Sequence, residues 1–276
     1  MMIGIITDKK DANIEKLEKA FEEKNIPATT YSIGRLALFT RDVESVLMYG
    51  KERVDISGAL IRAEPNLAQF VEPLVDILIS KGAYCNIRPN AYYTLSNLPL
   101  VYAMLNSCKI PITKTHMVAT IESLENAIER FSFPVIIKVF VKNKKTQSIV
   151  IDSKRGFSSF IKSIKGKVDA ITLQEFLEGD LTYVAVVGEK TFAVKRKWDK
   201  NRFEHQKKKR PAAISETESK IAISALKNIG LDIGIVKLIE GKVVGMRPYI
   251  DFIEFEKVLG KNVALTVAEY CEAWLK

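Results

Sequence analysis

The stretch ITLQEFLEGDLTYVAVVGEKTFAVKRK, residues 171–197, contains three β-rich runs separated by short turns. The runs are rich in β-branched and aromatic residues, and glycines lie in both turns, at Gly179 and Gly188. Short connections of this kind join antiparallel strands. The stretch therefore predicts an antiparallel sheet in the C-terminal half, which IGIVKLI at 233–239 and KVVGMRPYI at 242–250 extend.

The N-terminal third has a different pattern. IGIIT at 3–7 precedes a helical pattern that begins at Ile14, and extended runs at 28–33 and 56–62 lead to an apolar helix over 67–80. Strands that alternate with helices are typical of a small, doubly wound parallel sheet. The first loop has no GxGxxG motif, so this part does not predict a dinucleotide site.

The composition is that of a globular protein, with 47% hydrophobic and 27% charged residues. No run approaches the roughly 18 consecutive apolar residues of a membrane-spanning helix. We find no signal-peptide pattern at the start, and we therefore expect a cytoplasmic protein with no membrane partner. Three scattered cysteines and two histidines argue against a disulfide framework or a zinc site. The net charge of +9 favours anionic partners.

Seven strings, in their order and spacing, resemble the ATP-grasp superfamily, and most closely its RimK-like branch of carboxylate-amine ligases. They are CNIRP at 85–89, IPITKT at 110–115, FPVIIK at 133–138, LQEFLEG at 173–179, VAVVGEKTFAVKRK at 184–197, LDIGIVKLIEG at 231–241 and KNVALTVAEY at 261–270. The resemblance covers nearly the whole chain. It implies an α/β fold of three parts, in which the N-terminal parallel sheet is followed by two α+β subdomains whose antiparallel sheets enclose a nucleotide cleft. The expected boundaries are 1–88 for the N-terminal domain, 89–168 for the central lid and 169–276 for the C-terminal subdomain.

The resemblance also implies roles for particular residues. Such ligases activate a carboxylate as an acyl phosphate with ATP, and an amine then displaces the phosphate. Lys138 matches the lysine that contacts the nucleotide, and Arg196 and Asn201 match residues that hold phosphate and substrate. The adenine and ribose are expected to face a hinge strand, whose matching residues are Gln174, Glu175, Phe176 and Leu177.

Other family positions are replaced. The magnesium-binding aspartate of the family is Lys237 here, and the usual Glu-x-Asn-Pro, which supplies two further metal ligands, is Gly245-Met246-Arg247-Pro248. Lysine, glycine and arginine offer no side-chain oxygen, which magnesium requires. We therefore expect no metal ligands at these positions and hold magnesium binding in doubt. The phosphate loop expected at 141–148 also lacks glycine.

Two interpretations follow, and the sequence leaves both open. In the first, ligase chemistry is lost, as in a pseudoenzyme, and a cationic pocket binds an anion, a nucleotide without metal, or an acidic partner. In the second, Lys237 and Arg247 replace magnesium by direct charge in an active ligase, with Asp251, Glu254 or Glu256 as substitute acids.

A basic segment over 195–210, which we expect to be a connector that leads to a helix from about Glu216, adds a third possibility. It contains nine lysines and arginines interleaved with Trp198 and Phe203: Lys195, Arg196, Lys197, Lys200, Arg202, Lys207, Lys208, Lys209 and Arg210. Lysines neutralise nucleic-acid phosphates and aromatic rings stack on bases, so RNA is one candidate partner. An acidic small molecule or acidic protein is the other, and a solvated charge run needs no partner. Self-association into a homo-oligomer also stays open.

Overall fold

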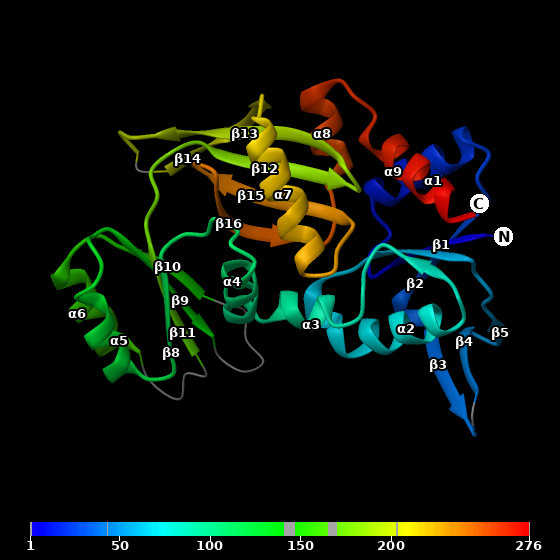
Figure 1. Cartoon of the computed structure of the whole chain (residues 1–276), viewed down its shortest axis with the longest axis horizontal. Coiled ribbons are helices and arrows are strands. Elements are labelled where there is room, and N and C mark those ends of the chain that lie inside the picture. The colour runs from blue at the N-terminus through cyan, green and yellow to red at the C-terminus, as the bar shows by residue number, and fades with distance from the viewer. Residues whose placement is uncertain (1, 43, 141–146, 165–169, 203, 276) are drawn as a thin grey trace. The chain divides into compact units, whose positions relative to one another are not determined.

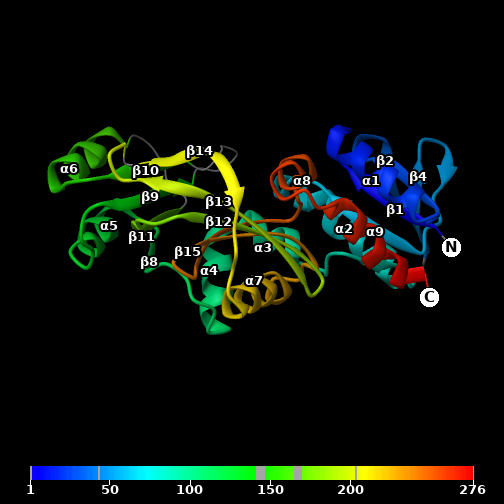
Figure 2. The same ribbon diagram turned by 90° about the horizontal axis from the view of Figure 1, so that it is seen from above.

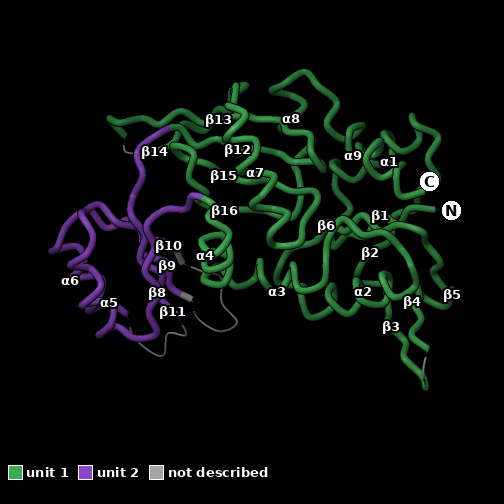
Figure 3. Tube along the Cα trace, viewed as in Figure 1, with its two compact units in different colours: residues 1–110, 180–276 green, residues 111–179 purple. Residues whose placement is uncertain are grey.

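The computed structural model describes residues 2–42, 44–140, 147–164, 170–202 and 204–275. The chain divides into two compact units (Figure 3): unit 1 comprises residues 1–110 and 180–276, and unit 2 comprises residues 111–179. The three-part boundaries expected from the sequence stay a prediction.

Unit 1 begins with a parallel sheet in the order β2-β1-β6-β7. Its strands are β1 (Ile3–Thr7), β2 (Ala28–Ser32), β6 (Gly58–Arg62) and β7 (Tyr84–Cys85). Helix α1 (Ala12–Glu23) connects β1 to β2, and α2 (Ala68–Ser80) connects β6 to β7. Both β1 and β6 are buried along their whole length, as expected for the inner strands of a doubly wound sheet. The predicted parallel sheet is therefore confirmed.

A separate antiparallel sheet lies between β2 and β6 in the chain. It consists of β3 (Leu36–Arg41), β4 (Glu44–Tyr49) and β5 (Glu52–Arg53). These strands were not predicted from the sequence, although residues 36–49 contain two short apolar runs, LALF and VLMY, separated by polar residues.

Two helices, α3 (Ala91–Ser96) and α4 (Leu98–Ser107), follow the parallel sheet. The side chain of Asn97 caps α4 by accepting a hydrogen bond from the backbone N of Leu100 at 3.2 Å, and Pro99 lies in the first turn.

The third sheet of unit 1 is antiparallel and has the order β14-β13-β12-β15-β16 (Figure 1). Its strands are β12 (Leu181–Val187), β13 (Lys190–Asp199), β14 (Glu204–Pro211), β15 (Ile233–Ile239) and β16 (Lys242–Arg247). The sequence analysis treated the basic segment as a connector, which was wrong, because residues 204–211 form a strand that pairs with β13. Lysines do not prevent strand formation at the edge of a sheet, where their charges remain solvated.

Helices cover this sheet on both faces. Helix α7 (Glu216–Asn228) buries Ala222, Ala225 and Leu226 on one face. On the other face, Tyr183, Ala185 and Ile235 join a core with α8 (Phe252–Leu259), α9 (Val263–Glu272) and α1. Helices α1 and α9 lie side by side in both views (Figures 1 and 2), so the two ends of the chain share one core.

Unit 2 is a four-stranded antiparallel sheet in the order β10-β9-β11-β8, with two helices. The strands are β8 (Thr115–Val118), β9 (Val135–Phe140), β10 (Gln147–Ile151) and β11 (Ala170–Glu175), and the helices are α5 (Ile121–Ile128) and α6 (Lys154–Ser163). Leu124 of α5 and Phe157 of α6 pack on Ile137 and Leu173, which closes one face of the sheet.

Candidate anion-binding site

A row of residues crosses the C-terminal sheet at one level. Tyr183 of β12 lies opposite Lys237 of β15, and Lys237 lies opposite Gly245 of β16. Directly opposed residues in a sheet point to the same face. Two of the three replaced metal positions are therefore neighbours on one face of one sheet.

The same face carries further cations. Arg196 is opposite Leu181, two residues before Tyr183, and Lys209 is opposite Arg196. Arg247 follows Gly245 by two residues in the same strand and register. Since side chains alternate with a period of two, four cations share the face of Tyr183. We call these five residues the cationic row: Lys209, Arg196, Tyr183, Lys237 and Arg247.

The ring of Tyr183 is the centre of the row. The Nζ atom of Lys209 lies 4.0 Å from the ring centroid, and the Arg196 Cζ and Lys237 Nζ atoms each lie 5.6 Å from it. Cations are attracted to the negative face of an aromatic ring, which partly offsets their mutual repulsion. Burial raises the pKa of Tyr183, whereas Arg196 and Arg247 act to lower it. The family resemblance implies an arginine at this position, and no role was predicted for the tyrosine from the sequence.

Arg196 has unused hydrogen-bonding capacity. Its Nε atom is buried and has no hydrogen-bond partner among the described residues. A buried donor without a partner is costly, so an anion that accepts from it would be favoured.

Lys209 has a deeply buried side chain, which is 6% exposed. It forms an ion pair with Glu254 in the first turn of α8. Burial lowers the pKa of Lys209, and the contact with Glu254 acts in the opposite direction. Sequence reasoning missed this pair, since Lys209 was one lysine among several in the basic segment.

The three acids considered as substitute metal ligands already have other partners. Asp251 caps α8 by accepting from the backbone N of Glu254 at 3.0 Å. Glu254 pairs with Lys209, and Glu256 accepts from Lys16 Nζ at 2.5 Å and from the Ala264 backbone N at 3.0 Å. Among the residues that the structure describes, no three His, Cys, Asp or Glu side chains gather as a metal site. Lys237, Gly245 and Arg247 offer no side-chain oxygen, so a magnesium ligand from this chain would have to come from other residues.

Asn201 has a different environment from Arg196. It lies in the exposed turn between β13 and β14, where its backbone N donates to Asp199 Oδ1 at 3.1 Å. It therefore lies beyond the end of β13, and Arg196 lies within that strand.

The remaining predicted residues belong to unit 2. Lys138 lies opposite Thr172, and Gln174 lies two residues further along β11, so all three share the face opposite the α5 and α6 core. Burial lowers the pKa of Lys138 to about 8. The Thr172 Oγ1 atom is buried without a hydrogen-bond partner among the described residues. This face therefore combines a cation with an unsatisfied hydroxyl.

The hinge residues are partly used within unit 2. Gln174 Nε2 donates to Thr113 Oγ1 at 3.0 Å and to Thr115 Oγ1 at 2.9 Å. The Glu175 carboxylate accepts from the backbone N of Lys114 at 2.8 Å. Phe176 and Leu177 follow β11 and are half-buried. The expected phosphate loop lies mostly outside the described residues, which lack 141–146.

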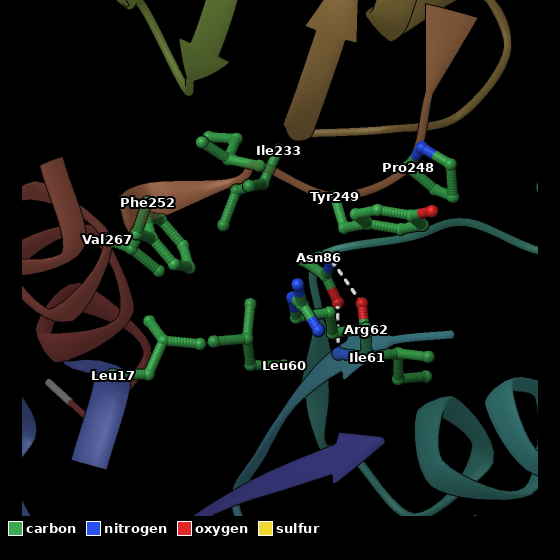
Figure 4. Close-up of a pocket in the computed structure, with 11 residues that line it drawn as sticks. Leu17, Leu60, Ile61, Arg62, Asn86, Ile233, Pro248, Tyr249, Phe252 and Val267 are labelled. Carbon is green, nitrogen blue, oxygen red and sulfur yellow. Dashed lines mark hydrogen bonds between the residues drawn. The ribbon is translucent and has the colours of Figure 1, made fainter. Parts of the chain in front are cut away.

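A small pocket lies near the parallel sheet (Figure 4). Asn86 fills one side, where its side chain accepts from the Ile61 backbone N at 2.7 Å and donates to the Ile61 carbonyl at 3.1 Å. Arg62 lies over the Tyr249 ring at 5.1 Å. The free volume is about 10 Å³, which is room for about one water, so this pocket does not fit a nucleotide.

Comparison with known proteins identifies the class. Residues 97–270 match the model of the RimK-like ATP-grasp domain, and the chain belongs to this family. A search of the curated proteins found no match.

Solved structures share the fold over the whole chain. The ATP-grasp ligase PsnB, complexed with a phosphomimetic variant of its minimal precursor, Mg and ADP, aligns with a TM-score of 0.78 at 13% identity, covering 100% of this chain and 99% of that one. The RimK domain ATP-grasp protein of Sphaerobacter thermophilus aligns at 0.72 and 16% identity, with coverages of 98% and 99%. The macrocyclase MdnC of Microcystis aeruginosa, bound with precursor peptide MdnA, aligns at 0.71 and 15% identity, covering 98% of each chain.

These comparisons confirm the predicted family and fold. They give no support to the doubt about magnesium, since the PsnB complex contains Mg and ADP. That doubt rests on the side chains of this chain alone. No helix in the described part of the chain is long and apolar enough to cross a membrane.

Proposed function

We propose that this RimK-like ATP-grasp protein binds a nucleotide or a related polyanion by direct contact with cations, and that ordinary ligase catalysis is lost or altered. The observation that supports the proposal is the cationic row: its Lys237 and Arg247, together with Gly245 on the same face, stand where the family resemblance implies metal ligands. The charge that magnesium would supply to a triphosphate is then supplied by lysine and arginine.

Electrostatics favour this assignment over a rebuilt metal site. A cation about 4 Å from a divalent ion would repel it by about 8 kcal/mol at an effective dielectric of about 20. The nearby acids already have other partners, since Asp251 caps α8, Glu254 pairs with Lys209 and Glu256 accepts from Lys16 and the Ala264 backbone N. The same positive face would attract the phosphates of ATP.

For nucleotide binding we assign Lys138 a phosphate-contacting role and the residues Gln174, Glu175, Phe176 and Leu177 a hinge role, as the family resemblance implies. Arg196 is assigned to phosphate, where its buried Nε atom is available as a donor. Asn201 is assigned to the acceptor, as a residue of the exposed turn. An acidic peptide or protein is the partner that we favour, because relatives of the same fold were solved with precursor peptides.

Isothermal titration with ATP tests the proposal directly. We expect similar ATP affinities in excess magnesium and in EDTA, and no release of ADP when acidic acceptor peptides are added. Binding that requires magnesium, together with ADP release on addition of an acceptor, would mean an active ligase with a rebuilt metal site. Tight, salt-sensitive binding of RNA in place of ATP would instead favour a nucleic-acid function.

A further inference from the structure

Strand β14 and helix α8 border a groove that adjoins the cationic row at Lys209. Its free volume is about 650 Å³, and it is lined by Lys208, Lys209, Arg210, Pro211, Glu254, Lys257 and Val258. One wall is therefore a strand and the other is one side of a helix, since residues 254, 257 and 258 are neighbours on a helical surface.

The strand wall is the edge of its sheet. β14 stands first in the order β14-β13-β12-β15-β16, and among the described strands only β13 pairs with it. An edge strand presents backbone N–H and C=O groups that can pair with a further strand. A groove between an edge strand and a helix suits an extended peptide, which adds to the sheet and lays its side chains along the helix.

The charges of the groove select the peptide. Lys208, Arg210 and Lys257 are exposed, and the single acid of the lining, Glu254, is paired with Lys209. Lysines on an edge strand repel strands that carry basic residues. They also lose hydration when a neutral strand pairs with the edge, so lysines disfavour pairing with arbitrary chains. An acidic strand reverses this effect, because its carboxylates form ion pairs with the same lysines.

The spacing adds a second requirement. Lys208 and Arg210 are two residues apart on β14, so they share the face opposite to that of Lys209 and are about 6.6 Å apart along the strand. A peptide with acidic residues at alternate positions presents its carboxylates with the same period. A peptide with contiguous acids directs half of them to the opposite face.

RNA fits the groove less well. It has no peptide backbone to pair with β14, and Trp198 of the neighbouring strand packs edge-on against His205, with ring centroids 5.0 Å apart. Phe203, the other aromatic residue of the basic segment, lies outside the described residues.

We infer that the groove between β14 and α8 binds an extended acidic peptide as an additional strand, with acidic residues at alternate positions. This inference names the partner of the proposed function. Peptide binding is measured without nucleotide, so it can fail or succeed independently of ATP binding.

The test uses fluorescence anisotropy with labelled hexapeptides of alternating glutamate and threonine. We expect the alternating peptide to bind the full-length protein roughly tenfold more tightly than a contiguous Glu-Glu-Glu-Thr-Thr-Thr peptide. Methylation of alternate backbone nitrogens, which removes strand donors and keeps the charge, should weaken binding by a similar factor. The inference is overturned if the three peptides bind equally.

Variants locate the binding surface. The double variant Lys208→Glu/Lys257→Glu changes two exposed side chains, and it should weaken peptide binding about tenfold or more while ATP affinity is kept. The matched control is Lys200→Glu, an exposed lysine of the same hairpin outside the groove, which should change binding less than about twofold. Equal weakening by Lys200→Glu, or tighter binding of oligouridylate that the double variant abolishes, would contradict a peptide groove.

Discussion

Lys237 lies directly opposite Tyr183 across strands β12 and β15, and its Nζ atom lies 5.6 Å from the centroid of the tyrosine ring. The ring attracts the ammonium group, and the lysine chain lies beside Gly245, where a Cβ atom would be in ordinary van der Waals contact with the lysine Cδ at 3.7 Å. A positive charge is therefore held in the centre of the row at a position where the family resemblance implies an acid.

Arg196→Ala should weaken ATP binding in EDTA about tenfold, because it removes a charged donor whose Nε atom lacks a partner among the described residues. Isothermal titration measures the change. Lys200→Ala, in the exposed turn of the same hairpin, is the control and should have little effect. Equal losses in the two variants would indicate diffuse attraction to the net charge and no defined site.

Glu254→Gln should lower the free energy of unfolding by about 1–3 kcal/mol, because it leaves the buried ammonium of Lys209 without its carboxylate. Urea unfolding measures this change. The matched control is Glu216→Gln, whose pair with Lys220 is solvent-exposed and should contribute less than about 0.5 kcal/mol. The same variant should bind ATP more tightly than the wild type, since it removes a negative charge beside the row.

The pH dependence of ATP binding should report on Lys138, whose pKa burial lowers to about 8. A lysine that contacts phosphate must be protonated, so its contribution to affinity is complete below pH 8 and falls up to about tenfold per pH unit above it. Lys138→Met should bind ATP more weakly at pH 7 and lose this part of the pH dependence. An unchanged pH profile in the variant would remove Lys138 from the site.

Folding stability depends on the same group with the opposite sign. The unfolded lysine keeps its proton up to its ordinary value of 10.5, whereas the folded one releases it near pH 8. The unfolded state then binds more protons between these values, so the contribution of Lys138 to stability rises with pH over this interval. The wild type should therefore gain stability relative to Lys138→Met between pH 8 and 10, as measured by urea unfolding.

Much of the fold was predictable from local pattern. The inner strands β1 and β6 are apolar except for their last residues, Thr7 and Arg62, and the β-branched, apolar runs of β12, β13 and β15 indicated the C-terminal sheet. Helix α8 was missed although Asp251 and the spacing of Phe252 and Phe255 give a recognisable start. Strand β14 was not recognised because its lysines are typical of a solvated connector. Edge strands tolerate such charges, whereas inner strands do not.

The candidate site was predictable only in part. Alternation along single strands places Gly245 and Arg247 on one face, but it cannot specify which residue of another strand lies opposite. The grouping of Lys209, Arg196 and Tyr183 depends on the register between strands and on a bulge between Arg196 and Trp198. The pair of Lys209 with Glu254 depends on the packing of α8, which no local pattern contains.

The most direct measurement compares the response to magnesium of the wild type and a variant with family ligands restored. The triple variant Lys237→Asp/Gly245→Glu/Arg247→Asn places oxygen donors on the face of the cationic row, and a Cβ atom at Gly245 meets no close contact. We predict that the ATP dissociation constant of the wild type is the same with and without magnesium, and that the variant binds ATP roughly tenfold more tightly with the ion. A wild type that already needs magnesium to bind ATP would contradict the account.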